Sequence, residues 1–248
     1  MYTKAVFLDK DGTLIENVPY NVDPKKIRLV DGALEGLKKL HAAGYQIVVV
    51  TNQSGVALGK FGEEDLRGVE ERIRSLMERR RIPLSGFFYC PHHPDGIVKQ
   101  YAIRCFCRKP SPGLLFQAAR ELQINLAASW MIGDILNDVE AGHRADCRTI
   151  LIDNGNETEW KLSPLREPHY KVKNLMEAVD TIIEADAPAP MVEERERLPV
   201  KVMRTTSVHT ISSATASIIA AAAARAEARV AASQPTSRRR SRGTKVKF

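Results

Sequence analysis

The feature of this sequence that most restricts its fold is the alternation of short apolar segments with helix-like segments. Residues 5–9 (AVFLD) and 47–50 (IVVV) are nearly continuous apolar runs, as expected of strands buried on both faces of a parallel sheet. Further strands are expected at residues 87–89, 130–134 and 148–152. This order of segments predicts an α/β fold with a doubly wound, mostly parallel sheet.

The segments between these runs carry apolar residues at helical spacing. A helix is expected between Gly32 and Gly44, because leucine recurs there at every third position. A second, charged helix is expected at residues 63–80, with an apolar face made of Leu66, Val69, Ile73 and Leu76. Three further helices are expected at residues 112–122, from about residue 138, and at residues 174–184.

The composition changes near residue 186. Residues 187–190 (APAP) look like a linker, and an Ala/Ser-rich segment and a basic, low-complexity end follow. Residues 187–248 hold 12 Lys and Arg against 4 Asp and Glu, whereas residues 1–186 hold 25 against 26. The net charge of +7 therefore belongs to the tail. We expect residues 1–186 to form one domain and residues 187–248 a tail that is disordered or partly helical.

The sequence contains no apolar run of the length of about 18 residues or more that a membrane span needs. Its first residues lack the basic, apolar and small-residue layout of a signal peptide. We therefore expect a cytoplasmic protein without a membrane partner, and we expect it to be a monomer.

Carboxylates follow the ends of two expected strands. Asp9 and Asp11 lie in the segment DKDGT after the first strand, Thr51 follows the second, and Asp134 ends the fourth. Ligands bind open α/β sheets beyond the carboxyl ends of the strands, so these groups should converge. Crowded carboxylates need a counter-ion, and Mg²⁺ is the natural one for oxygen ligands. Lys109, just before an expected helix, could add a fixed positive charge.

Each of these groups fits phosphoryl transfer. A carboxylate can attack phosphorus and form a covalent intermediate. A second carboxyl two residues along, Asp11, can protonate the leaving oxygen and later deprotonate water. The metal and Lys109 would neutralise charge on the phosphoryl oxygens, and the Thr51 hydroxyl would hold them. A lone D-x-D-G-T is often a solvated turn, but several such motifs in this order favour catalysis.

The motifs DKDGT, VVTN, RKP and GDILND resemble those of the haloacid dehalogenase-like phosphatases. The resemblance implies Asp9 as nucleophile and Asp11 as general acid and base. It implies Thr51 and Lys109 as phosphate ligands that stabilise the transition state. It also implies Mg²⁺ bound by the carboxylates of Asp9 and Asp134 and the carbonyl of Asp11. No segment between the motifs is long enough for a large cap domain, so loops must shape the pocket.

A second group of metal ligands lies between the motifs. Cys90 and His92 are followed, after twelve residues, by Cys105 and Cys107. Four such ligands suit a closed tetrahedral Zn²⁺ site, and in a cytoplasmic chain this clustering favours a metal over disulfides. The zinc would be structural and would staple the loop between the two pairs. The alternative is a set of free thiols beside a loop histidine.

With this cluster, the resemblance narrows to the D-glycero-D-manno-heptose 1,7-bisphosphate 7-phosphatases, over residues 4–179. It implies a small sugar bisphosphate as substrate and a step towards nucleotide-activated heptose for surface glycans such as lipopolysaccharide. Ile135 and Leu58 stand where related sequences usually carry basic residues, so the exact sugar and its anomer stay open. The residues expected to bind the substrate are Asn17, Tyr20, Asn52, Gln53, Ser54 and Arg108.

Other interpretations remain open at this stage. Histidinol-phosphate phosphatases look similar and carry a zinc loop, although their loop is typically shorter; a broader sugar-phosphate phosphatase is a further option. Residues 238–242 (RRRSR) could bind phosphate backbones non-specifically, but without interleaved aromatics no specific nucleic-acid partner is expected. A catalytically inactive scaffold is disfavoured, because no motif carboxylate is missing.

Overall fold

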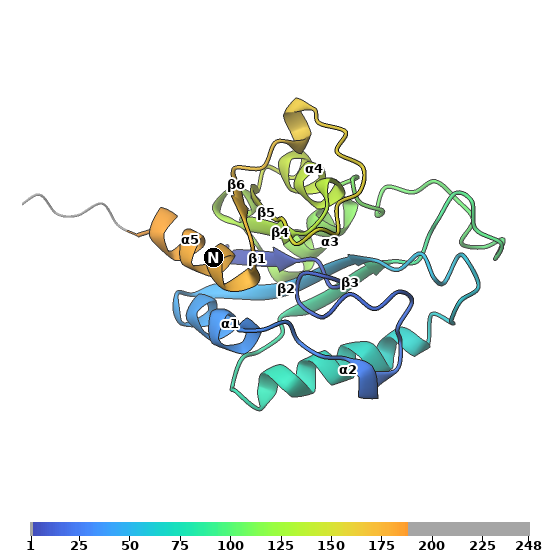
Figure 1. The fold of residues 1–248 in the computed structure, drawn as a ribbon, viewed down its shortest axis with the longest axis horizontal. Coiled ribbons are helices and arrows are strands. Elements are labelled where there is room, and N and C mark those ends of the chain that lie inside the picture. The colour runs from blue at the N-terminus through green and yellow to red at the C-terminus, as the bar shows by residue number, and fades with distance from the viewer. Residues whose placement is uncertain (1, 188–248) are drawn as a thin grey trace, which may run out of the picture. The chain divides into compact units, whose positions relative to one another are not determined.

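The computed structural model describes residues 2–187, and its strands form one six-stranded sheet in which every neighbouring pair is parallel (Figure 1). The strands are β1 (Lys4–Leu8), β2 (Tyr45–Asn52), β3 (Gly86–Cys90), β4 (Trp130–Gly133), β5 (Arg148–Ile152) and β6 (Tyr170–Val172), in the order β3-β2-β1-β4-β5-β6. The predicted α/β fold with a parallel sheet is confirmed. The sequence did not reveal β6, because this edge strand has three residues and two of them are exposed.

Among the described residues, four helices connect consecutive strands from β1 to β5, and a fifth follows β6: α1 (Ala33–Ala42), α2 (Asp65–Glu78), α3 (Gly113–Leu122), α4 (Leu136–Arg144) and α5 (Leu175–Ala185). Short 3₁₀ turns lie at Pro24–Lys26, Leu126–Ala128 and Pro164–Arg166. The expected apolar face of α2 is confirmed, since Leu76 is partly buried against the core, and the face also includes Met77. Met77 is fully buried because it lies four residues after Ile73 on the same side of the helix.

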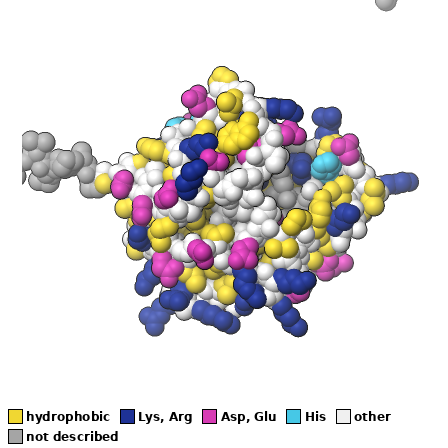
Figure 2. Space-filling view, viewed as in Figure 1, with side chains coloured by type: hydrophobic (Ala, Val, Ile, Leu, Met, Phe, Trp, Pro, Cys, Tyr) yellow, Lys and Arg dark blue, Asp and Glu magenta, His cyan; other side chains and the backbone are white. Residues whose placement is uncertain are grey.

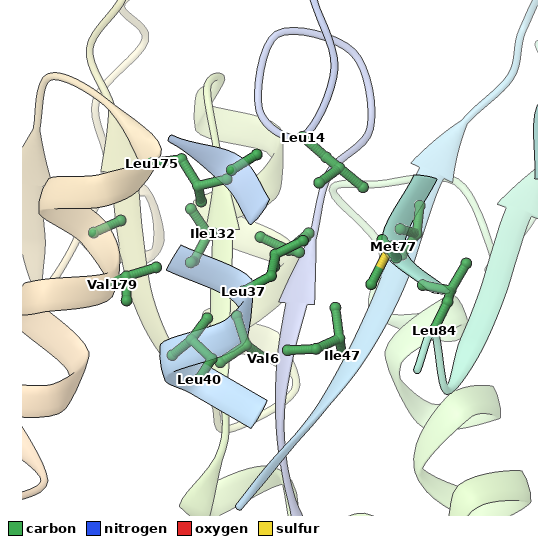
Figure 3. Close-up of a cluster of buried hydrophobic side chains, with 14 of the residues drawn as sticks. Val6, Leu14, Leu37, Leu40, Ile47, Met77, Leu84, Ile132, Leu175 and Val179 are labelled. Carbon is green, nitrogen blue, oxygen red and sulfur yellow. The ribbon is translucent and has the colours of Figure 1, made fainter. Parts of the chain in front are cut away.

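The core consists of two layers of side chains, one on each face of the sheet. Alternate residues of β1 point to opposite faces, so that Val6 packs with α1, α2 and α5, while Phe7 packs with α3 and α4. Figure 3 shows the first layer, in which Val6, Leu37, Ile47 and Val179 come together from four elements. Full burial of each such side chain contributes roughly 1.5–3 kcal/mol to folding.

The strand order creates the crevice in which a site can form. The chain passes from β1 to β2 on one side of β1 and later returns to β4 on its other side. Ligands bind at such a reversal, beyond the carboxyl ends of the strands. The backbone N–H of Asp9, directly after β1, donates to the carbonyl of Ile132 in β4 at 2.9 Å. The residues that follow β1, β2 and β4 therefore emerge side by side.

Loops rather than a further domain surround this edge. Among the described residues, 91–112 contain no helix or strand, and 9–32 contain only one 3₁₀ turn besides isolated bridges.

In the part of the chain from residue 2 to 187, no helix is long and apolar enough to cross a membrane. Residues 188–248 of the predicted tail lie outside the described residues. On the face in Figure 2, Lys and Arg side chains are interspersed with Asp and Glu, as the balanced charge of residues 1–186 leads one to expect.

Candidate active site

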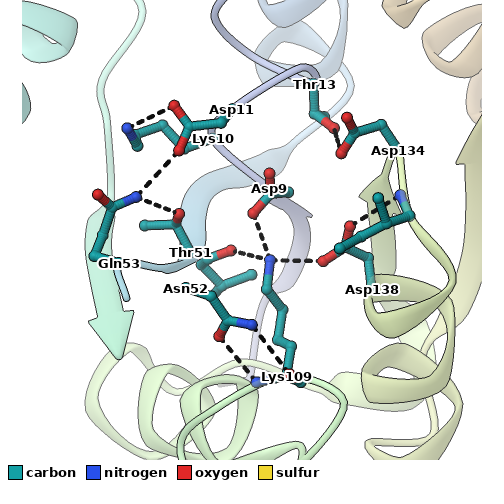
Figure 4. Close-up of polar contacts among 12 residues, drawn as sticks. Asp9, Lys10, Asp11, Thr13, Thr51, Asn52, Gln53, Lys109, Asp134 and Asp138 are labelled. Atoms are coloured by element: carbon teal, nitrogen blue, oxygen red, sulfur yellow. Dashed lines mark hydrogen bonds and ion pairs between the residues drawn. The ribbon is translucent and has the colours of Figure 1, made fainter. Parts of the chain in front are cut away.

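A buried lysine lies at the centre of the site. The side chain of Lys109 is 1 % exposed, and its Nζ lies 2.5 Å from Oδ1 of Asp9 and 2.6 Å from Oδ1 of Asp138 (Figure 4). Nζ also donates to the carbonyl of Val50 in β2 at 2.8 Å. Burial opposes the charge of this lysine, but Asp138 and Asp9 outweigh that effect and raise the pKa of Lys109 above its ordinary value. The two carboxylates thus favour the charged ammonium form of Lys109.

Three carboxylates crowd around this lysine. Oxygens of Asp9, Asp134 and Asp138 lie within 4.8 Å of one another, and all three residues are buried. Burial, followed by the charges of Asp9 and Asp138, raises the pKa of Asp134 to about 8. Asp138 is held by Lys109 and by the backbone N–H of Ile135 at 3.3 Å. Burial and the neighbouring negative charges thus disfavour the ionised form of Asp134, and a hard divalent cation such as Mg²⁺ bound by Asp9 and Asp134 would compensate that charge.

Asp11 lies at the rim of this cluster. Its side chain is 31 % exposed, and its two oxygens contact the Nζ of Lys10 at 2.8 Å and the amide of Gln53 at 3.2 Å. The same amide nitrogen of Gln53 donates to Oγ1 of Thr51 at 2.9 Å. Burial raises the pKa of Asp11 above the ordinary aspartate value, Lys10 opposes this rise, and Asp9 adds to it. A carboxyl group with a raised pKa is suited to donate a proton.

Two adjoining cavities open at this edge and share Asp11, Asn17 and Asn52 in their walls. The first measures about 200 Å³ and is lined by Asp9, Asp11 and Asp134, together with Thr51 and Lys109. The second measures about 240 Å³ and is lined by loop residues, among them Asn17, Tyr20, Gln53, Ser54 and Phe61. The first is of a size for a phosphoryl group, and the second lies where the remainder of a substrate would extend.

Two predicted substrate contacts make other contacts in the structure. The amide of Asn52 donates to the carbonyl of Lys109 and accepts from its N–H, both at 3.0 Å. These two hydrogen bonds connect Asn52, the last residue of β2, to the backbone of Lys109. Arg108 donates to the carbonyl of His92 at 3.3 Å and lines neither cavity. The structure thus places Asn17, Tyr20, Gln53 and Ser54 at the second cavity. It places Arg108 next to His92, in the loop that follows β3.

The segment after β5 also reaches the site, and sequence reasoning missed it. Asn156 donates to Oδ2 of Asp134 at 2.7 Å, and Asn154 donates to the carbonyl of Gly12 at 2.7 Å. Gly12 has a φ of +82°, and a Cβ there would lie 2.1 Å from Oδ2 of Asp134, so glycine is required. The signal was available, because polar residues directly follow β5 just as they follow β1, β2 and β4. Asp138 was likewise absent from the predicted site residues.

The predicted zinc ligands form a compact cluster next to the end of β3. The three sulfurs of Cys90, Cys105 and Cys107 lie 3.2–3.5 Å apart, and Nδ1 of His92 lies 3.3 Å from the Cys107 sulfur. Zinc–sulfur bonds of about 2.3 Å at tetrahedral angles would place sulfurs roughly 3.8 Å apart. All four cysteines of the described residues are free thiols. The donor set and its spacing therefore fit one zinc ion.

Comparison with known proteins agrees with the fold and with the site. Residues 106–178 match the model of the HAD-hydrolase-like family. A D-glycero-beta-D-manno-heptose-1,7-bisphosphate 7-phosphatase of Yersinia pestis is 40 % identical over 178 residues, which are 68 % of this chain and 95 % of that protein. The enzyme of the same name from Escherichia coli strain K12 is 37 % identical over 178 residues, 68 % of this chain and 93 % of that protein.

A solved structure shows the same relationship. The D,D-heptose 1,7-bisphosphate phosphatase of B. bronchiseptica, complexed with magnesium and phosphate, superimposes with a TM-score of 0.64 at 28 % identity. The match covers 73 % of this chain and 99 % of that one. The chain therefore belongs to the haloacid dehalogenase-like phosphatases, in the family of the heptose-1,7-bisphosphate 7-phosphatases.

Proposed function

We propose that this protein removes the 7-phosphate of D-glycero-beta-D-manno-heptose 1,7-bisphosphate through an aspartyl-phosphate intermediate on Asp9. The observation that carries the proposal is the buried ammonium of Lys109, 2.5 Å from Asp9 in a crevice that also holds Asp134 and Asp138. The substrate follows from the relatives, since the chain spans 95 % of the Yersinia pestis enzyme. The reaction would serve the synthesis of nucleotide-activated heptose in the cytoplasm.

The side chains have complementary tasks in this reaction. A carboxylate oxygen of Asp9 attacks phosphorus, while Lys109 orients that carboxylate and stabilises charge on the phosphoryl oxygens. The hydroxyl of Thr51 holds a phosphoryl oxygen. Asp11 protonates the leaving sugar oxygen and then deprotonates the water that releases phosphate. Mg²⁺, held by Asp9, Asp134 and the carbonyl of Asp11, would supply the remaining positive charge when bound.

The second cavity suits the sugar and its other phosphate. Asn17, Tyr20, Gln53 and Ser54 surround it with polar and aromatic groups. Ile135 lines the first cavity where related sequences usually carry a basic residue. The chain thus lacks a cation at that point, and the preference between anomers depends on the polar groups of the second cavity.

Substrate preference is tested by phosphate release from a panel containing both anomers of heptose 1,7-bisphosphate, fructose 1,6-bisphosphate and histidinol phosphate. We expect kcat/KM to be at least about tenfold higher for the beta heptose anomer than for the others, a difference of about 1.4 kcal/mol in transition-state binding. A preference for histidinol phosphate would keep the fold and the chemistry but overturn the proposed substrate.

We further propose that Cys90, His92, Cys105 and Cys107 bind one structural zinc, since the four ligands leave no position for water. The purified protein should contain about one zinc per chain, and Cys107→Ala should lose it. Because the domain has its own core, the variant should stay folded while residues 93–104 become sensitive to proteases. Metal analysis and limited proteolysis measure both effects, with the isolated thiol variant Cys147→Ala as control. A zinc-free protein with full activity and an intact loop would exclude the structural role.

A further inference from the structure

We infer that Lys10 and Gln53 form a clamp that fixes the carboxyl group of Asp11 for proton transfer. The inference rests on the proposed function, in which Asp11 is the general acid. Figure 4 shows the arrangement: Nζ of Lys10 contacts Oδ1 of Asp11 at 2.8 Å, and Nε2 of Gln53 donates to Oδ2 at 3.2 Å. Each carboxyl oxygen is held by a different side chain, so the clamp sets both the position and the rotation of the group.

The burial of the clamp indicates that it is built for Asp11. Lys10 is 1 % exposed and Gln53 is 4 % exposed. Burying an ammonium group is costly unless it is paired, and Asp11 is the carboxylate with which Lys10 forms an ion pair among the described residues. The backbone of Lys10 is also fixed, because its carbonyl accepts the N–H groups of Leu14 and Ile15 at 3.1 and 2.9 Å.

Gln53 connects the acid to the phosphoryl cavity. Its side-chain nitrogen donates to Oγ1 of Thr51 at 2.9 Å as well as to Asp11. Its own backbone N–H donates to the carbonyl of Cys90, the last residue of β3, at 2.8 Å. Gln53 therefore fixes the distance between the proton donor and the hydroxyl that would hold the phosphoryl group. Lys10 and Gln53 both line the second cavity, and in the clamp they act as positioning residues through Asp11.

Asp11 stands where its proton is needed. It lines both cavities, at the boundary between the phosphoryl group and the rest of the substrate. In the first step, an oxygen of Asp9 bonds to phosphorus, the bond from phosphorus to the sugar oxygen breaks, and that oxygen keeps the electron pair. The proton of Asp11 then neutralises it. A leaving group that is stable as an anion does not need this proton, so its departure should not depend on the clamp.

The test compares two leaving groups in the first step. Lys10→Met and Gln53→Leu should each slow sugar release from heptose 1,7-bisphosphate in a single turnover by about 10–100-fold, part of the 10²–10⁴-fold that a general acid contributes. The burst of 4-nitrophenolate from 4-nitrophenyl phosphate should slow by less than about threefold. Lys10→Arg, which keeps the charge, should recover most of the sugar rate. Lys39→Met, which removes an exposed lysine on α1 that pairs with Asp180, is the control.

Equal losses with both substrates, or no loss with either, would overturn the clamp. If Lys10→Met does not fold, as judged by its thermal unfolding, Gln53→Leu and Lys10→Arg decide the question in the same assay. Asp9→Asn distinguishes a failure of the clamp from a failure of the proposed function. If it leaves the burst intact, the proposed function fails; if it abolishes the burst while the clamp variants show no dependence on the leaving group, the inference alone fails.

Discussion

Asp9→Asn is expected to lower kcat by at least about 10³-fold, because a neutral amide cannot attack phosphorus. The substitution keeps the shape of the side chain, and its amide oxygen can still accept a hydrogen bond from Lys109. Folding should therefore persist while turnover is lost. No labelled phosphoenzyme should be trapped from a phosphate-labelled substrate after an acid quench, whereas the unaltered protein should give a labelled band.

A matched control is Asp180→Asn on α5, an exposed carboxylate that pairs with Lys39 on the surface. It should leave kcat unchanged. If Asp9→Asn lowers kcat by less than tenfold, Asp9 is not the nucleophile. If the unaltered protein has no turnover with any phosphate monoester, the chain is a catalytically inactive scaffold. That outcome is not expected, because no motif carboxylate is missing.

Strand ends were the part of the site that the sequence predicted best. Asp9, Thr51 and Asp134 each follow or end an apolar run, and parallel pairing brings such positions to one edge without any knowledge of side-chain contacts. Local patterns were sufficient for this purpose, because a buried parallel strand appears as a continuous apolar segment. The same rule failed for β6, in which Tyr170 and Lys171 are exposed at the edge of the sheet.

Pairings between distant residues were not predictable from the sequence. Lys109 lies 100 positions from Asp9, and Asn52 lies 57 positions from Lys109, yet both pairs form direct hydrogen bonds. Asn52 was predicted to bind the substrate, and it lines both cavities. Its amide also pairs with the Lys109 backbone, a contact that depends on where the loop before α3 returns to the sheet. The RKP motif placed Lys109 in the site through the family resemblance, but it did not predict the contact between its backbone and Asn52.

Lys109→Met should lower kcat by about 10²–10³-fold through loss of electrostatic stabilisation, and it should also destabilise the fold. The substitution leaves the fully buried Asp138 without its charged partner. Breaking a buried ion pair in this way costs about 3–5 kcal/mol in the free energy of unfolding, whereas Lys39→Met at the surface should cost about 0.2–1 kcal/mol. Urea unfolding in the presence of a chelator measures both without interference from a bound metal.

The double variant Lys109→Met/Asp138→Asn separates charge from packing. If an uncompensated carboxylate causes the loss, the second substitution should recover much of the lost stability without restoring kcat.

Burial raises the pKa of Asp138 to about 6, although Lys109 lowers it, so loss of Lys109 should raise it further. A raised carboxyl pKa makes the folded state bind its proton more tightly than the unfolded state. The stability deficit of Lys109→Met relative to the unaltered protein should therefore be largest well above pH 6 and shrink as the pH falls towards 6, where Asp138 becomes protonated in both folded proteins. A deficit that is independent of pH, and that Asp138→Asn does not reduce, would instead assign the effect of Lys109 to packing of its side chain.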